Sequence, residues 1–269
     1  AREIADGNYD VQVPVVRNDE LGLLGREFNH MAQEVKRSAQ LEKDILANVS
    51  HDLRTPLTSI SGYAELIENG MAKQEDIPTF GHRIHKEAQR MITLVSDILQ
   101  LSELDGMSKQ QENSPTADFV PVDLGVLVKD VATNMTVNAR KAYITLQYKV
   151  QPVTVRGSHD LLTELVTNLC DNAIRYNRPG GHVELSCGTN ADGCPYFCVE
   201  DNGIGIPQDS QSRVFERFYR VDKSRSKATG GTGLGLAIVK HIAVLHGARI
   251  DLESTVGTGT TIRIIFPKM

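Results

Sequence analysis

The chain has 269 residues and lacks any apolar run of the ~18 residues that a membrane-spanning helix requires. It also shows no signal-peptide pattern, so we expect this part of the protein to be cytoplasmic. Basic residues are not in excess, with 29 Lys and Arg against 34 Asp and Glu. The resulting net charge of −5 argues against a nucleic-acid-binding protein. The first residue is alanine rather than methionine, which suggests a piece of a longer protein.

Cysteine is scarce as well. The four cysteines are Cys170, Cys187, Cys194 and Cys198, and their spacing matches no zinc-binding pattern. Cys194 and Cys198 form at most a weak pair, and free thiols in a reducing compartment are the favoured interpretation. Internal repeats are absent, and only residues 105–118 have the polar composition of a linker. The length indicates about two domains with a substantial core.

Residues 1–40 begin with a turn-rich stretch and then alternate valines at positions 11, 13 and 15. A helix is predicted to start at Asn18-Asp19-Glu20, because short acidic side chains favour a helix N-terminus. Its apolar positions are spaced by three or four residues: Leu21, Leu24, Phe28, Met31 and Val35.

Residues 41–104 predict two long helices joined by a turn at Asn69-Gly70. Each helix has one apolar stripe: Leu53, Leu57, Ile60, Ala64 and Ile67 in the first, and Ile84, Ala88, Met91, Val95 and Ile98 in the second. A single hairpin cannot bury both stripes well. A dimeric four-helix bundle would bury them, so we predict a homodimer.

From Phe119 onward, short strands alternate with helices. Strands are predicted at 144–150, 153–156, 182–188, 196–200, 249–254 and 260–266, and helices at 124–139, 160–176 and 233–245. This order is typical of an α/β sandwich with helices on one face of a mixed sheet. Gly257 and Gly259 fit a hairpin between the last two strands. The predicted fold class is therefore multidomain, a helical hairpin followed by an α/β domain.

His51 is the most informative residue of the helical part. On a wheel of about 100° per residue it lies well away from the apolar stripe, and Thr55 lies one turn further along the same side. An imidazole in water, with Asp52 beside it and a hydroxyl one turn away, suits nucleophilic chemistry. A merely solvated histidine is the alternative. Pro56 is expected to bend the helix, either as a signal-sensitive hinge or as a tolerated kink.

Four segments of the last domain combine residue types that suit a phosphate-bearing ligand. In residues 168–176, Asn168 and Asn172 leave the same helical face, with Arg175 and Tyr176 close by. Amide oxygens suit Mg²⁺, and a guanidinium suits phosphate oxygens. A purely structural role for the two asparagines is the alternative.

The second segment, residues 201–207, directly follows an apolar strand. Gly203 and Gly205 allow a backbone to approach a flat ring closely, and the Asp201 carboxylate can accept a hydrogen bond from an exocyclic amine. A simple turn after the strand is the alternative.

The third segment, residues 214–220, contains Arg217 and Arg220 and leads into the polar residues 222–229. We interpret it as a lid over phosphates, with a solvated charged loop as the alternative. The fourth segment, Gly231-Thr232-Gly233-Leu234-Gly235, opens a helix, where backbone N–H groups favour an anion. It is neither a Walker A loop nor a dinucleotide fingerprint, because no strand leads into it.

In this order, the four segments resemble the N, G1, F and G2 boxes of the ATP-binding domain of sensor histidine kinases. This is the Bergerat (GHKL) fold, shared with gyrase and the heat-shock ATPase chaperones. Residues 51–56, His-Asp-Leu-Arg-Thr-Pro, resemble the phosphoacceptor motif of the family's dimerisation and phosphotransfer (HisKA) domain. Residues 19–31 resemble the second half of a HAMP signal-relay module.

The resemblance implies a division into four parts. These are residues 1–40, the C-terminal part of a HAMP module; 41–104, the dimerisation and histidine phosphotransfer domain; 105–118, a linker; and 119–269, the catalytic ATP-binding domain. The parent protein is expected in the bacterial cell membrane, with its membrane and sensing segments upstream of Ala1.

By this resemblance the chain is an ATP-dependent protein-histidine autokinase of a two-component system. His51 would accept the γ-phosphoryl of ATP and pass it to an aspartate of a response regulator. Asp52 would orient or deprotonate the other ring nitrogen, although a short aspartate reaches a neighbouring ring less easily than a glutamate. Thr55 would orient water for dephosphorylation of the regulator, which implies a phosphatase activity.

The resemblance also assigns the nucleotide site. Asn172 would hold Mg²⁺, and Asp201 would read adenine, with Gly203 and Gly205 lining the ring. The remaining contacts to base and phosphates would come from Arg175, Tyr176, Arg217, Arg220, Gly231, Thr232, Gly233, Leu234 and Gly235. Asn168 stands where gyrase-type relatives have a glutamate that activates water, and an amide is no base at neutral pH. We therefore expect slow ATP hydrolysis.

Two other functions stay open on these patterns. One is a Bergerat-type ATPase whose hydrolysis drives movement, which Asn168 disfavours. The other is a non-enzymatic signalling scaffold that only binds a regulator.

Overall fold

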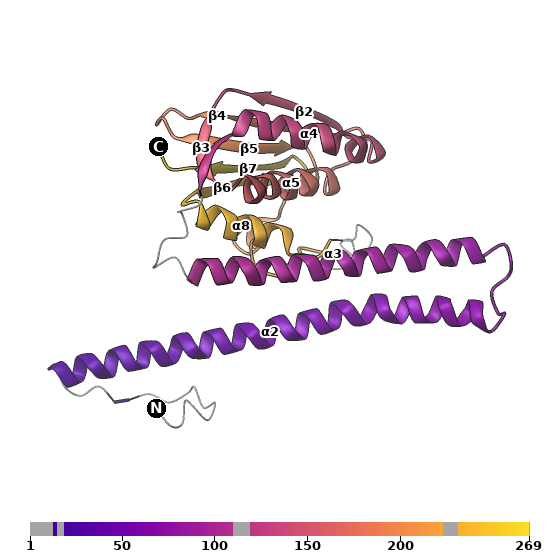
Figure 1. The fold of residues 1–269 in the computed structure, drawn as a ribbon, viewed down its shortest axis with the longest axis horizontal. Helices are drawn as coiled ribbons and strands as arrows, with labels where there is room; N and C mark the ends of the chain where they lie inside the picture. Colours follow the sequence, from indigo (N-terminus) through magenta and orange to yellow (C-terminus); the bar gives the residue numbers. More distant parts are fainter. Residues whose placement is uncertain (1–12, 15–18, 110–118, 223–230, 269) are drawn as a thin grey trace. The chain divides into compact units, whose positions relative to one another are not determined.

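The structure, a computed structural model, describes residues 13–14, 19–109, 119–222 and 231–268 (Figure 1). It divides into two compact units, Ala1–Met91 and Ile92–Met269. Val11 and Val15 of the alternating pattern lie outside the described residues. The same holds for residues 110–118 of the expected linker and for residues 223–229 of the expected lid.

The first unit contains the long helix α2 (Glu20–Glu68) and the first part of α3 (Ile77–Lys109). The Gly22 N–H donates to the Asp19 side chain at 3.1 Å, which confirms the predicted helix start. The helix predicted before residue 40 and the one predicted after residue 41 form one uninterrupted helix. Residues 31–50 contain no glycine or proline that would end it.

The two helices meet at the predicted turn. Asn69 caps α2, and Gly70 follows with a φ of +67°, a conformation that glycine adopts at little cost. Across the hairpin, the rings of Tyr63 and Phe80 lie 5.1 Å apart, and Arg83 Nη1 donates to the Tyr63 hydroxyl at 2.6 Å. α2 continues past Pro56, which lies inside it.

Several large apolar side chains along α2 stay exposed within one chain. Large apolar side chains with exposed fractions between 38% and 65% are Leu21, Leu24, Met31, Val35, Leu46 and Leu57. This surface is unusual for an isolated unit, because burial of such side chains is the main driving force of folding and association.

The second unit begins with the last part of α3. Residues 105–109 belong to this helix, so the prediction that the linker starts at residue 105 is wrong. Leu101 and Leu104 are only 3% and 1% exposed, and their burial stabilises the final turns. The helix therefore tolerates Gly106, which costs about 1 kcal/mol relative to alanine.

The rest of the second unit is an α/β domain. Its strands are β1 (Val120–Asp123), β2 (Thr145–Val150), β3 (Thr154–Gly157), β4 (His182–Thr189), β5 (Pro195–Asp201), β6 (Arg249–Thr255) and β7 (Gly259–Ile265). Its helices are α4 (Leu124–Lys141), α5 (His159–Arg175), the short α6 (Gln208–Gln211) and α8 (Gly235–Leu245). The predicted strands and helices all occur, with ends within two residues, and β1 and α6 are additional.

Five strands form one mixed sheet in the order β2-β4-β5-β7-β6, in which only β2 and β4 are parallel. α4 packs on β4, α5 on β4 and β5, and α8 on β6, so the helices form a layer against the sheet (Figure 1). Strand β4 alternates buried and partly exposed residues, as a sheet covered on one face should. The predicted α/β sandwich is confirmed, with Leu165, Leu185, Phe197 and Ile264 fully buried between the layers.

Candidate functional site

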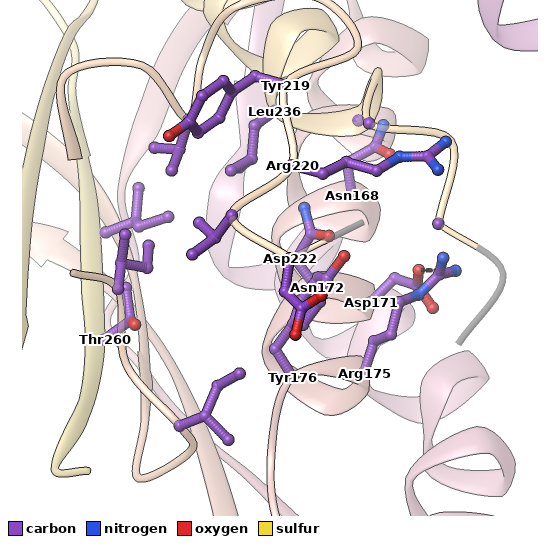
Figure 2. A pocket seen from close by; sticks show the side chains of 18 of the residues that line it. Asn168, Asp171, Asn172, Arg175, Tyr176, Tyr219, Arg220, Asp222, Leu236 and Thr260 are labelled. Carbon is purple, nitrogen blue, oxygen red and sulfur yellow. Dashed lines mark hydrogen bonds and ion pairs between the residues drawn. The ribbon is translucent and has the colours of Figure 1, made fainter. Parts of the chain in front are cut away.

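The second unit holds a cavity of about 420 Å³ bounded by α5, the loop after β5, the β6–β7 hairpin and the start of α8. In Figure 2, the polar side chains of α5 lie on one side of this cavity and Thr260 lies on the opposite side. Of the residues predicted from sequence, those that line it are Asn168, Asn172, Arg175, Tyr176, Asp201, Gly205, Arg220, Gly231, Thr232, Gly233 and Gly235. Segments far apart in the sequence thus meet at one site.

Helix α5 supplies the polar wall of the cavity. Asn168 and Asn172 are one turn apart and both line it, as their spacing predicts. Arg175 Nη2 donates to Asp171 Oδ2 at 2.6 Å, an ion pair between neighbouring turns (Figure 2). The opposite side of α5 is buried in the core through Val166 and Cys170, which fixes the direction of these polar side chains.

The loop after β5 is held by its own aspartate. The Gly203 N–H donates to Asp201 Oδ1 at 2.8 Å, and burial raises the pKa of the Asp201 carboxyl. A Cβ on Gly203 would lie 2.5 Å from the Tyr176 carbonyl oxygen, and one on Gly205 would lie 2.1 Å from that of Thr255. Both glycines therefore allow backbone segments to pack closely, and Gly203 does not line the cavity.

The glycine-rich segment before α8 lies against the polar face of α5. A Cβ on Gly235 would lie 3.0 Å from Asn168 Oδ1, and one on Gly231 would lie 3.1 Å from the Tyr176 hydroxyl. Gly233 has a φ of +74°. Leu234 is fully buried and does not line the cavity, so it anchors the segment to the core.

The two ends of the expected lid are tied together. The Phe218 N–H donates to the Gly233 carbonyl at 2.9 Å, and Arg220 Nη2 donates to the Thr232 carbonyl at 2.9 Å. Phe218 has a φ of +61°, which is strained for a residue with a side chain. The lid base is therefore a defined structure.

Arg217 lies outside the cavity lining, unlike Arg220. Its Nη2 donates to Asp105 Oδ1 at 2.5 Å and lies 3.0 Å from His241 Nε2. In the same unit, Thr232 Oγ1 donates to Asp97 Oδ2 at 2.7 Å, and burial raises the pKa of the Asp97 carboxyl. The structure therefore gives Arg217 a contact with α3 rather than with the cavity.

The apolar part of the cavity was not predicted from sequence. It is formed by side chains of the loop after β5, the lid base, α8 and the β6–β7 hairpin: Ile204, Ile206, Val214, Leu236, Val256 and Ile262. Tyr219, Asp222 and Thr260 also line it. The signal available in the sequence was the pair Gly257 and Gly259, which we assigned only to a hairpin.

His51 lies on α2 in the first unit, and its side chain is 71% exposed. Its Nδ1 is 3.2 Å from Asp52 Oδ1, so the short aspartate does reach the neighbouring ring. Thr55, one turn later, donates from Oγ1 to the His51 carbonyl at 3.4 Å. The structure thus places a solvent-facing imidazole beside a carboxylate and a hydroxyl, as predicted.

The structure also bears on the cysteines, on metal-binding clusters and on membrane-spanning helices. All four cysteines are free, as predicted. Within the described residues, no cluster of three or more His, Cys, Asp or Glu side chains is arranged to hold a metal ion. The helices of the described part also contain no stretch with the length and apolarity needed to traverse a bilayer.

Three family models match successive parts of the chain. The HAMP domain matches residues 1–37, the His Kinase A (phospho-acceptor) domain matches 41–106, and the histidine kinase-, DNA gyrase B- and HSP90-like ATPase matches 157–269. Together with the exposed histidine and the cavity, these matches define the class. The chain belongs to the sensor histidine kinases of two-component systems.

Among named members of this family, the chain is 37% identical over 240 residues to the sensor protein kinase WalK of Staphylococcus saprophyticus. The match covers 88% of this chain and 38% of that relative, so the chain spans about two fifths of its length.

Solved structures of histidine kinases have the same fold. ShkA in complex with AMPPNP is 27% identical, with a TM-score of 0.58 over 83% of this chain and 45% of that chain. ThkA in complex with the response regulator protein TrrA is 21% identical, with a TM-score of 0.68 over 87% of this chain and 64% of that chain. The ThkA likeness concerns the fold alone.

Proposed function

We propose that this chain binds ATP in the cavity of its second unit, phosphorylates His51 and passes the phosphoryl group to an aspartate of a response regulator. The observation that carries the proposal is the pairing of two sites in one chain. One is an exposed imidazole whose Nδ1 faces a carboxylate, and the other is a cavity with a polar wall on α5, a half-buried aspartate and a glycine-rich edge.

The cavity fits ATP at both ends. At one end, Asp201 lies among apolar side chains such as Ile204 and Ile262, which suits the amine and the faces of adenine. At the other end, Gly231 and Gly235 leave the space beside Tyr176 and Asn168 that a Cβ would fill. Backbone N–H groups at this edge suit phosphate oxygens. The similarity to ShkA, solved with AMPPNP, supports this assignment.

Asn172 is the proposed ligand of Mg²⁺, because its amide lines the cavity near the phosphate end. When bound, the cation would neutralise charge on the transferring phosphoryl group. Arg175 and Arg220, which also line the cavity, would bind phosphate oxygens. Arg217 contacts α3 and is not included in this set.

At the phosphoacceptor site, Asp52 holds Nδ1 and leaves Nε2 as the attacking nitrogen. The carboxylate would fix the tautomer and stabilise positive charge on the ring as the N–P bond forms. Asn168, an amide in the cavity wall, cannot act as a base toward water. ATP is therefore reserved for His51 rather than hydrolysed, which disfavours a movement-driving ATPase.

The proposed assembly is a homodimer. The exposed apolar side chains along α2, such as Leu24, Leu46 and Leu57, would be buried in a four-helix bundle with a second copy. The proposed partner is a cognate response regulator, as membership of the sensor histidine kinases supports, and Thr55 would orient water for its dephosphorylation. We further propose a parent protein anchored in the bacterial cell membrane by segments outside this chain.

The test is labelling of the chain with [γ-³²P]ATP and Mg²⁺. The wild type should acquire a label that is stable to base and lost in acid, and His51→Gln should acquire none. Asn172→Asp should abolish or sharply reduce the label. Phosphate release without labelling would favour the ATPase, and neither label nor release would favour a scaffold that only binds a regulator.

A further inference from the structure

Arg178 makes hydrogen bonds that the four sequence segments of the site do not account for. It follows α5 by three residues and does not line the cavity. Its Nη2 donates to the Gly203 carbonyl at 2.9 Å and also to the Gly257 carbonyl. One guanidinium group therefore bonds to two separate backbone segments.

These two segments form the base end of the cavity. Gly203 belongs to the loop that carries Asp201, and Gly257 belongs to the β6–β7 turn that carries Val256. The Gly257 N–H also donates to the Ile204 carbonyl at 2.9 Å. Arg178 thus joins the end of α5, the loop after β5 and the β6–β7 turn behind the wall that would meet adenine.

The joined segments need such a connection because of their composition. Gly205 and Gly257 have φ values of +70° and +83°, and glycine backbones lose more conformational freedom on ordering than any other residue. Without the tie, part of this ordering would occur only when a ligand binds, and the entropy lost would weaken binding. A planar guanidinium with several donors is better suited than an ammonium to holding two carbonyl groups at once.

We propose that Arg178 is a positioning residue that preorganises the base end of the cavity and thereby sets the affinity for ATP. The inference rests on the proposed function, because the ligand is ATP. Arg178 touches no reacting group, so it acts on binding of the nucleotide and leaves transfer to His51 essentially unchanged once ATP is bound.

The test compares Arg178→Ala, Arg178→Lys and the wild type in the full chain. Equilibrium binding of MgATP gives Kd, and initial rates of His51 labelling give KM and kcat. For Arg178→Ala we expect Kd and KM to rise about tenfold, the effect of ordering about one more backbone residue on binding, while kcat changes less than about twofold. Arg178→Lys should recover part of the affinity, because its ammonium can still reach one carbonyl.

Arg156→Ala is the matched control. Arg156 also ties two segments, donating from Nη2 to the Phe119 carbonyl at 3.0 Å, but it lies away from the cavity lining. It should leave Kd and KM at wild-type values. If it raises them as much as Arg178→Ala does, the effect is general loosening and the proposal is overturned.

Other results also separate the two proposals. Unchanged Kd in Arg178→Ala, or a fall in kcat with unchanged KM, would overturn the role of Arg178. A wild type that binds MgATP but takes no label would overturn the autokinase, while the binding comparison would still decide the role of Arg178. If Arg178→Ala does not fold, Arg178→Gln and Arg178→Lys carry the comparison, and wild-type Kd in both would overturn the proposal.

Discussion

Gly205→Ala should damage the nucleotide site more than its small size suggests. Gly205 has a φ of +70°, and an added Cβ would lie 2.1 Å from the Thr255 carbonyl oxygen and 2.6 Å from its carbon. These are backbone atoms of the β6–β7 hairpin, so they cannot rotate away as a side chain would. The hairpin must move, and Val256 and Thr260, which line the cavity, must move with it.

The structure supplies a control that separates the two costs of this substitution. Gly180 has a φ of +82°, but a Cβ there would meet no atom within 4 Å. Gly180→Ala should therefore carry only the backbone penalty, about 1–2 kcal/mol. Gly205→Ala should carry the same penalty plus an overpacking term of about 1–3 kcal/mol.

Urea unfolding of the two variants and the wild type measures the difference in the free energy of unfolding. Equilibrium binding of MgATP to the same proteins shows whether the cavity is altered. We expect Gly205→Ala to be the less stable variant by about 1–3 kcal/mol and to bind ATP more weakly than Gly180→Ala. Equal destabilisation with unchanged ATP affinity would refute the argument that backbone contact, rather than φ alone, requires glycine at position 205.

Three further predictions concern single groups. Burial raises the pKa of Asp201, so on acidification its carboxylate is protonated at a higher pH than that of an ordinary aspartate. ATP binding by the wild type should weaken as the pH falls through this raised pKa. Asp201→Asn should bind ATP weakly at every pH, so a titration of its Kd against pH should lack this transition. The folded state takes up this proton more readily than the unfolded state, so the same group makes stability fall as pH rises through the raised pKa, and urea unfolding of both proteins measures this. Asp52→Asn should slow labelling of His51 about 10²–10⁴-fold by removing a carboxylate 3.2 Å from Nδ1, and an unchanged initial rate would contradict its role. Burial raises the pKa of the Cys170 thiol to about 12, so iodoacetamide at pH 8 should modify the half-buried Cys194 first, and equal rates by mass spectrometry would contradict this.

The sandwich could be predicted from sequence because its elements have strong local signals. β4 alternates buried and partly exposed residues, and Ser158 and Asp123 cap α5 and α4 with their side chains. β1 was missed because it has four residues, one of them proline, and its partner β3 lies more than 30 residues away. Such pairing depends on tertiary contact rather than on local pattern.

The polar half of the site was predictable, whereas the apolar half was not. The sequence marks three polar residues, Asn168, Asn172 and Asp201, within or directly after apolar segments. Burying a polar side chain costs free energy unless it is hydrogen-bonded, so such residues indicate a binding site. Ile262 on β7 has the same appearance as any core residue, and only the fold shows that it lines the cavity. For the same reason, no sequence pattern marks Arg178, because only the fold brings its two carbonyl acceptors beside it.

The uninterrupted length of α2 has a mechanical consequence. From Glu20 to His51 the helix advances 1.5 Å per residue, about 47 Å in all, with no proline between them. A continuous helix of this kind would transmit rotation and axial displacement from its start to His51. Each residue inserted into the helix would rotate the imidazole by about 100° about the helix axis relative to the start of the helix. Seven inserted residues would return it to within about 20° of its original direction. The rotation of the helix about its axis, more than its length, therefore decides the direction in which the His51 side chain points.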